Sequence, residues 1–192
     1  MKIVCLLGSP RKNGNSATVA TRLLARAAEL GADVESIYLN GLQFRGCQAC
    51  YACKHGAETC VIKDDLAPVL EKVREADAVV LVSAVYYGDI TAQLKTFIDR
   101  TFCYLKPDYH ARPDCSRLAP DKGMAMILIQ GHPDQDSFAD IFPRYDFFFN
   151  WYGYRPGHLL RGMGISERSD VTKRDYLMDG ARDIAEKLVR GL

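Results

Sequence analysis

The sequence predicts an α/β fold in which helices cover both faces of a parallel sheet. Short apolar runs alternate with longer amphipathic segments from one end of the chain to the other. The apolar runs are continuous, as they are in parallel strands that are buried on both faces. The chain has 192 residues and a hydrophobic content of 48%, which suits a single domain over residues 1–192.

The first strand and helix flank a polar loop. Residues 3–7 are a continuous apolar run, and residues 16–30 place apolar side chains on one helical stripe that Gly31 closes. Residues 33–39 form the next predicted strand. Residues 41–63 show no periodicity and hold four cysteines, so they are predicted to form an irregular cysteine-rich loop after the second strand.

The middle of the chain continues the alternation. Asp64 and Asp65 can cap a helix that runs to residue 76. Residues 78–82 are a third continuous apolar run. Residues 91–105 are predicted to be helical, because their apolar residues fall on one stripe.

The last strands are predicted at residues 124–129 and 156–163, with helices over 137–151 and 172–188. Five strand–helix units favour a doubly wound sheet with the flavodoxin-like order 2-1-3-4-5. Such sheets bind ligands at the carboxyl ends of the strands, beside the point where the strand order reverses. We therefore expect the functional residues in three loops, those after Leu7, Val82 and Ile129.

The composition excludes several classes of function. The 25 basic and 24 acidic residues give a formal net charge of +1, which favours neither nucleic acid nor a membrane as partner. The apolar runs are too short to span a membrane, and the one at the N-terminus is too short for a signal peptide, so a cytoplasmic protein is expected. Seven cysteines, four of them within fourteen residues, indicate metal or redox chemistry.

The loop between the first strand and its helix has the features of an anion site. Backbone N–H groups and the positive end of the helix dipole attract a phosphate there. Ser9, Asn15 and Ser16 can add donors, and Arg11 can add charge. The loop has neither a Gly-Lys-Ser/Thr ending nor the pattern Gly-x-Gly-x-x-Gly, so a phosphate monoester fits best. The alternative is a polar turn capped by Asn15 or Ser16.

Aromatic residues follow the third strand. Tyr86 and Tyr87 lie in the segment 83–89, at a strand end beside the phosphate loop. Exposed rings and backbone amides in that position can hold a planar heterocycle. The alternative is that both tyrosines are packed loop residues. The charges of the following helix are interpreted as surface or interhelix charges, and they belong to Lys95, Asp99 and Arg100.

Cys47, Cys50, Cys53 and Cys60 can converge on one metal centre. Soft thiolates suit an iron–sulfur cluster or zinc. The tight triple Cys-x2-Cys-x2-Cys is typical of cubane clusters, whereas zinc sites more often use two separated pairs. A redox disulfide and metal-free thiols are the alternatives. Cys5 lies in a predicted strand and is expected to be a small core residue.

The segment 142–152 contains too many aromatic residues for a free surface helix. Part of it is expected in the core. The remainder is expected at an interface between subunits, because aromatic residues are enriched in interface cores. A homodimer or homotetramer is therefore predicted.

Motifs in three loops resemble the NADPH-dependent FMN reductase family. The segment from Gly8 to Ser16 resembles its FMN phosphate loop, and the segment from Ser83 to Arg100 resembles its second FMN loop and helix, with Ala84 where the family usually has proline. Gln130-Gly131 matches its third loop, and the likeness spans residues 1–165. The resemblance implies FMN bound by Ser9, Arg11, Asn15, Ser16, Ser83, Ala84, Val85, Tyr86, Tyr87, Gly88, Gln130 and Gly131.

Within that family, the cysteine spacing resembles the iron–sulfur flavoproteins. This resemblance implies an oligomer in which the cluster of one subunit lies close to the FMN of another, and a [4Fe–4S] cluster held by Cys47, Cys50, Cys53 and Cys60. It also implies an FMN-dependent NAD(P)H oxidoreductase, with NAD(P)H as transient donor and FMN exchanging electrons with the cluster. The expected redox partner is a small molecule or a protein such as ferredoxin. A non-enzymatic flavodoxin-like electron carrier and a cysteine-based redox sensor are the alternative functions.

Overall fold

Five parallel strands form the main sheet of the computed structural model, which describes residues 1–168 and 170–191. They are β1 (Lys2–Leu7), β2 (Asp33–Tyr38), β3 (Ala78–Tyr86), β5 (Gly123–Ile129) and β6 (His158–Gly162), in the order β2-β1-β3-β5-β6. A short strand, β4 (Asp89–Ile90), pairs antiparallel with the end of β3. Counted without β4, the order is the predicted 2-1-3-4-5, so the flavodoxin-like α/β sheet is confirmed.

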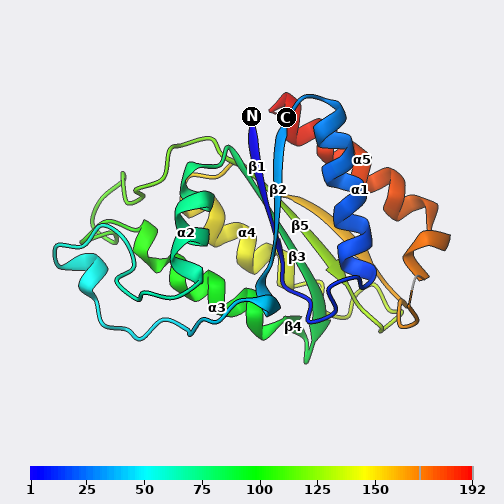
Figure 1. Cartoon of the computed structure of the whole chain (residues 1–192), viewed down its shortest axis with the longest axis horizontal. Coiled ribbons are helices and arrows are strands. Elements are labelled where there is room, and N and C mark those ends of the chain that lie inside the picture. Colours follow the sequence, from blue (N-terminus) through cyan, green and yellow to red (C-terminus); the bar gives the residue numbers. More distant parts are fainter. Residues whose placement is uncertain (169, 192) are drawn as a thin grey trace.

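Helices cover the sheet on both faces (Figure 1). On one face lie α1 (Asn15–Glu29) and α5 (Asp175–Arg190), which pack against each other. On the other face lie α2 (Leu66–Glu75), α3 (Ala92–Arg100) and α4 (Ile141–Trp151). The structure also contains short 3-10 helices at Leu39–Gly41, Ala52–Lys54, Thr101–Tyr104 and Asp170–Lys173.

Side chains alternate along the central strands between two hydrophobic clusters. Val4 and Leu6 of β1 belong to the cluster beneath α2, α3 and α4. Ile3 and Cys5 belong to the cluster beneath α1 and α5. Cys5 is fully buried, and burial raises its pKa to about 12. It is therefore the small core residue that the sequence predicts.

The region after β3 differs most from the sequence-based prediction. β3 runs on to Tyr86 instead of ending at residue 82, because its last residues pair with β4. Tyr87 and Gly88 form the turn between the two strands, with φ angles of 50° and 76°. Positive φ at both central residues is the requirement of a type I′ hairpin. The segment 83–89 is thus a hairpin rather than an open loop.

Two helices are shorter than predicted. α3 ends at Arg100, and the chain continues as a 3-10 helix in which the Thr101 hydroxyl donates to the carbonyl oxygen of Ile98 (2.6 Å). α4 begins at Ile141 rather than at residue 137. The carboxylate of Asp134 accepts the N–H of Ser137 (2.9 Å), which holds the preceding segment in a turn.

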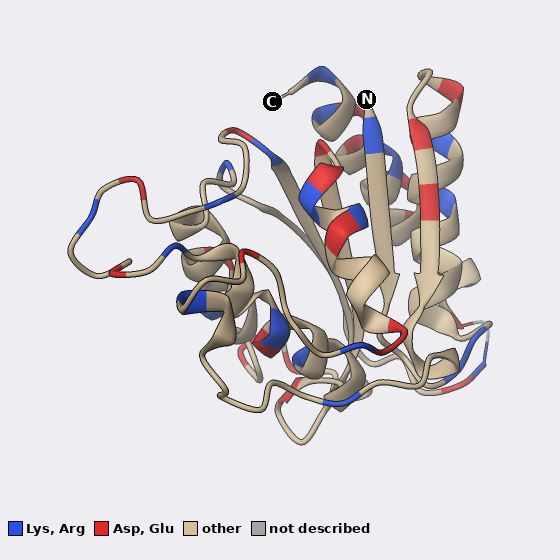
Figure 2. Ribbon diagram, turned by 60° about the vertical axis from the view of Figure 1, so that its left-hand side comes forward, with Lys and Arg blue, Asp and Glu red and all other residues tan. Residues whose placement is uncertain are grey.

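Charged residues of both signs are interspersed over the outer elements (Figure 2). One ion pair joins α1 to α5, with 2.7 Å between Arg26 Nη2 and Glu186 Oε1. None of the helices in the described residues is both long enough and apolar enough to cross a membrane.

Candidate functional site

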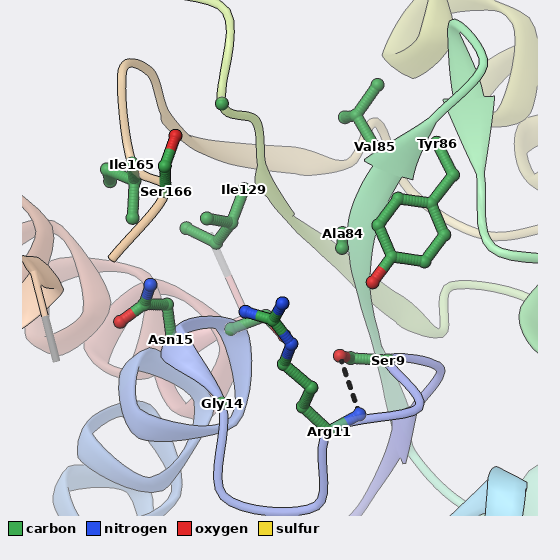
Figure 3. Close-up of a pocket in the computed structure, with 12 residues that line it drawn as sticks. Ser9, Arg11, Gly14, Asn15, Ala84, Val85, Tyr86, Ile129, Ile165 and Ser166 are labelled. Atoms are coloured by element: carbon green, nitrogen blue, oxygen red, sulfur yellow. Dashed lines mark hydrogen bonds between the residues drawn. The ribbon is translucent and has the colours of Figure 1, made fainter. Parts of the chain in front are cut away.

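A cavity of about 200 Å³ lies at the carboxyl ends of the strands (Figure 3). It is formed by the end of β3 and by the loops after β1, β5 and β6, where a doubly wound sheet binds its ligands. Eight of the twelve residues predicted to bind a cofactor line it. The full lining is Ser9, Arg11, Gly14, Asn15, Ser16, Ala84, Val85, Tyr86, Ile129, Gly131, Ile165 and Ser166.

The loop after β1 is fixed by contacts with α3. The carbonyl oxygen of Gly8 accepts the Thr91 hydroxyl (2.8 Å). A Cβ at position 8 would lie 2.8 Å from Leu94 Cβ, so glycine is what lets the end of β1 approach α3 this closely. The chain then turns through Ser9, whose Oγ accepts the N–H of Arg11 (3.2 Å; Figure 3).

The N-terminus of α1 lies at this cavity. Gly14 is its N-cap, no side chain in the described part of the chain caps the helix, and its first turn holds no acidic residue. The uncapped N–H groups and the positive end of the helix dipole therefore favour an anion. Arg11 extends into the same space, which adds a positive charge (Figure 3).

The loop after β6 forms the far side of the cavity with Ile165 and Ser166 (Figure 3). Asn15 Nδ2 donates to the carbonyl oxygen of Glu167 (2.8 Å) and so ties this loop to α1. Asn15 Oδ1 is buried and has no hydrogen-bond partner among the described residues. Sequence reasoning missed this loop, although β6 is parallel to β5 and its carboxyl end must reach the same edge.

The four cysteines predicted to hold a metal line a second cavity, of about 20 Å³, together with Cys103. They belong to the irregular segment 41–63, here called the cysteine loop (cyan in Figure 1). Cys47 and Cys50 are exposed, Cys53 and Cys60 are partly buried, and all are free thiols. Within residues 1–168 and 170–191, no three Cys, His, Asp or Glu side chains are grouped so that they could hold a metal ion.

The cysteine loop has an unusual backbone. Ala49 and Tyr51, which flank Cys50, have φ angles of 50° and 55°. Residues other than glycine rarely adopt this conformation, and when they do, the surrounding structure must hold them there. The loop is therefore shaped by its contacts with the rest of the protein.

Two buried cations lie close to the cysteines: Lys54 belongs to the cysteine loop itself, and Arg100 lies beneath it. Arg100 is 1% exposed, and its Nε donates to Cys60 Sγ (3.1 Å). Lys54 is 9% exposed, and its Nζ donates to the carbonyl oxygens of Phe102 (2.6 Å) and Leu105 (2.7 Å). Burial lowers the pKa of Lys54. Positive charge at this depth reduces the cost of placing negative sulfur ligands beside it.

Residues 1–130 match the family described as NADPH-dependent FMN reductase. The chain belongs to that family. The predicted resemblance of the chain to this family is therefore confirmed, and the match covers residues 1–130.

Relatives and solved structures agree with this family. An iron–sulfur flavoprotein of Archaeoglobus fulgidus is 41% identical over 104 residues, which are 54% of this chain and 47% of that protein. The chain thus spans about half the length of the curated iron–sulfur flavoproteins that it matches.

Solved structures share the fold over the whole chain. The NAD(P)H:quinone oxidoreductase of Methanothermobacter marburgensis has a TM-score of 0.77 at 19% identity, with 98% of this chain and 96% of that chain covered. An FMN-dependent NADH-azoreductase of Bacillus anthracis, solved in complex with FMN, has a TM-score of 0.75 at 16% identity, with 98% and 100% covered.

In this member of the FMN reductase family, four predicted cofactor residues lie outside the cavity lining, namely Ser83, Tyr87, Gly88 and Gln130. Ser83 is fully buried, and its Oγ accepts the N–H of Thr91 (2.9 Å). Gln130 is 1% exposed, and its Oε1 accepts the Nε–H of Arg161 (2.9 Å). Tyr87 is fully exposed at the tip of the hairpin. Ser83 and Gln130 thus stabilise the chain segments that form the cavity, although they do not line it.

One helix connects the two cavities of this family member. α3 begins directly after Thr91, which is bonded to the loop after β1, and ends at Arg100 beneath the cysteine loop. A helix of nine residues spans about 13 Å. The cavity at the strand ends and the cysteine loop are therefore joined by a single short helix, which fixes their relative position.

Proposed function

We propose that this protein binds FMN in the cavity at the strand ends and is an FMN-dependent NAD(P)H oxidoreductase. One observation carries the proposal: the uncapped N-terminus of α1 and Arg11 share a cavity with Val85 and Tyr86. An anion site beside a flat, partly apolar wall is what a phosphorylated flavin requires. Membership of the NADPH-dependent FMN reductase family supports the same cofactor.

The predicted cofactor residues fall into three groups by their place around the cavity. The phosphate would bind at the N-terminus of α1, to Ser9, Arg11, Asn15 and Ser16. The ring would lie against Ala84, Val85, Tyr86 and Gly131. The conformation of the chain around the cavity would be fixed by the hydrogen bonds and the turn of Ser83, Tyr87, Gly88 and Gln130.

The size of the cavity suits a flavin that is only partly enclosed. Its volume of about 200 Å³ is below the ~300–1,000 Å³ of pockets that enclose a drug-sized ligand. One side of the ring would therefore stay open to a nicotinamide or an electron acceptor. Bound FMN would supply the redox chemistry, so this chain has to bind and orient the ring and needs no nucleophile or general base.

We also propose that the cysteine loop holds a [4Fe–4S] cluster that exchanges electrons with FMN. The kind and number of donors fit, because four thiols line one cavity with the buried Arg100, although no three of them in the described residues are grouped closely enough to hold a metal ion as they stand. Likeness to iron–sulfur flavoproteins supports the same group. The ligands would be Cys47, Cys50, Cys53 and Cys60.

We further propose that residues 1–192 form a single domain and that this domain assembles as a homodimer or homotetramer. Phe147 and Phe148 of α4 are 65% and 47% exposed, and aromatic surface is enriched at interfaces. The partner in electron transfer would be a small molecule or a protein such as ferredoxin, in the cytoplasm. Light scattering tests the assembly, and a monomer at all concentrations would contradict it.

The direct test of the proposed activity is FMN binding followed by NAD(P)H oxidation. Protein stripped of flavin should bind FMN more tightly than riboflavin, because riboflavin has no phosphate for the α1 site. The loaded protein should then oxidise NADPH or NADH when an acceptor is added. Failure to bind FMN would contradict the site. Binding without oxidation of either nicotinamide would favour the electron carrier.

A further inference from the structure

Arg100 is a buried charged residue that the FMN cavity does not use. It ends α3, and only 1% of its surface is exposed. A guanidinium at this depth is costly unless its N–H groups all find partners. Its partners therefore show which part of the molecule it stabilises.

All the partners lie in the cysteine loop or directly after it. Nε donates to Cys60 Sγ (3.1 Å). Nη1 donates to the carbonyl oxygen of Arg45 (2.9 Å) and to Asp64 Oδ2 (2.9 Å). Nη2 donates to the carbonyl oxygen of Ile62 (3.4 Å) and to Asp64 Oδ1 (3.3 Å). A guanidinium has five N–H groups, so every donor is engaged.

These contacts close the cysteine loop at its base. Arg45 precedes the first cysteine of the loop, whereas Ile62 and Asp64 follow the last one. The Asp64 carboxylate also accepts the N–H of Arg45 (3.2 Å) and the N–H of Leu66 at the start of α2 (3.2 Å). Arg100 and Asp64 together join both ends of the loop to α3 and α2.

From this geometry we infer that Arg100 is a positioning residue for the cysteine site, which fixes Cys60, donates a hydrogen bond to its sulfur, and so raises the reduction potential of a cluster bound there. The inference rests on the proposed [4Fe–4S] site. Hydrogen bonds to sulfur ligands are among the determinants of cluster potential, because they stabilise the more negative, reduced state. A positive charge held out of water beside the ligand acts in the same direction.

Arginine is required for this role in a way that lysine cannot reproduce. Lysine keeps the charge, but it offers a compact ammonium in place of the planar guanidinium whose Nε, Nη1 and Nη2 reach different partners. The substitution Arg100→Lys therefore separates the hydrogen bond to Cys60 from the positive charge. Arg117→Lys is the matched control, because Arg117 lies beneath the same loop and donates to the carbonyl oxygens of Cys53, Cys103 and Leu105.

The first measurement is the reduction potential of the cluster in protein reconstituted without oxygen. We expect Arg100→Lys to retain iron and to lower the potential, with a change of about tenfold in the one-electron reduction equilibrium, or 59 mV. Arg117→Lys should keep the wild-type potential. Equal potentials in the wild type and Arg100→Lys would overturn the inference.

The second measurement uses metal-free protein, so that it does not depend on the cluster. Hydrogen exchange of the amides of residues 45–64 should be faster in Arg100→Lys than in the wild type, because the base of the loop is released. Unchanged exchange would show that Arg100 does not hold the loop. A wild type that takes up no iron would overturn the proposed cluster. The exchange rates of the metal-free protein would still show whether Arg100 holds the loop.

If Arg100→Lys does not fold, a double variant replaces it. Arg100→Met combined with Asp64→Asn removes the donors without leaving a buried carboxylate unpaired. It should show the same lowered potential and the same faster exchange as Arg100→Lys. A wild-type potential in the folded double variant would overturn the inference as well.

Discussion

The hydroxyl of Thr91 donates a hydrogen bond of 2.8 Å to the carbonyl oxygen of Gly8, and Thr91 is fully buried. The N–H of Thr91 donates in turn to Ser83 Oγ (2.9 Å). These bonds join the loop after β1 to the end of β3 and the start of α3, so two walls of the cavity are fixed relative to each other. The shape of the proposed FMN site thus depends on residues outside its lining.

Replacing Gly8 should disturb both the fold and the site. In Gly8→Ala the new Cβ would lie 2.8 Å from Leu94 Cβ and 2.9 Å from Thr91 Oγ1. Overpacking of this kind costs about 1–3 kcal/mol in the free energy of unfolding and should also weaken FMN binding. Urea unfolding and FMN titration measure both effects. Gly46→Ala is the control, because its Cβ would meet Thr96 Cγ2 at an unstrained 3.8 Å.

Arg11 should discriminate FMN from riboflavin. A charge-assisted hydrogen bond to phosphate contributes about 1.5–3 kcal/mol, so Arg11→Gln should raise the Kd for FMN by roughly ten- to a hundredfold. The Kd for riboflavin should hardly change, because riboflavin has no phosphate. Lys12→Gln, at an exposed residue outside the cavity lining, is the charge-matched control. A parallel loss of affinity for both flavins would place Arg11 away from the phosphate.

Tyr86 and Tyr87 should behave differently, although they are neighbours. Tyr86 lines the cavity, whereas Tyr87 is fully exposed at the hairpin tip. Tyr86→Ala should weaken FMN and riboflavin binding alike, by about three- to tenfold, because contacts of an aromatic ring are worth about 0.5–1.5 kcal/mol beyond area burial. Tyr87→Ala should leave both affinities near the wild-type values. Equal effects of the two substitutions would contradict the observed orientation.

The contact between α1 and α5 should be sensitive to acid. The hydrogen bond from Arg26 lowers the pKa of Glu186 below its ordinary value of 4.5. A carboxylate whose pKa is lower in the folded protein stabilises it fully above pH 4.5, and this contribution is lost as the pH falls through the folded-state pKa. The difference in unfolding free energy between the wild type and Glu186→Gln should therefore shrink in acid.

Denaturant unfolding at a series of pH values measures that difference. Glu29→Gln is the control, because Glu29 bonds the same arginine from a more exposed position, with 57% of its side chain accessible against 30% for Glu186. Glu29→Gln should change the free energy of unfolding less than Glu186→Gln does. A difference for Glu186→Gln that stays constant from about pH 6 to pH 3 would contradict the lowered pKa.

Local periodicity was sufficient to predict most of the fold. Continuous apolar runs occur in strands that are covered on both faces, and Cys5 is buried as that pattern requires. The two-residue strand β4 could not be predicted, because it is shorter than any periodicity window and exists only through its pairing with β3. The contribution of Ile165 and Ser166 depends on the position of β6 beside β5, which is a tertiary relationship.

The role of Arg100 was the least accessible to sequence reasoning. Lys95 and Asp99 of the same helix are surface charges, as expected, and they pair with each other (2.5 Å). Arg100, in contrast, lies three residues after the buried Phe97, on the inner stripe of the same helix. That spacing was a signal for burial, but its partners in the cysteine loop lie at least 36 residues away in the sequence.

The most direct test of the account is the cofactor content of protein purified without oxygen. Flavin, iron and acid-labile sulfide should be assayed on one sample, together with its absorption spectrum. We predict one FMN and about four irons per chain, with a broad absorption beneath the flavin bands. Flavin without iron or sulfide, even after anaerobic reconstitution, would contradict the cluster, and the absence of flavin would contradict the central claim.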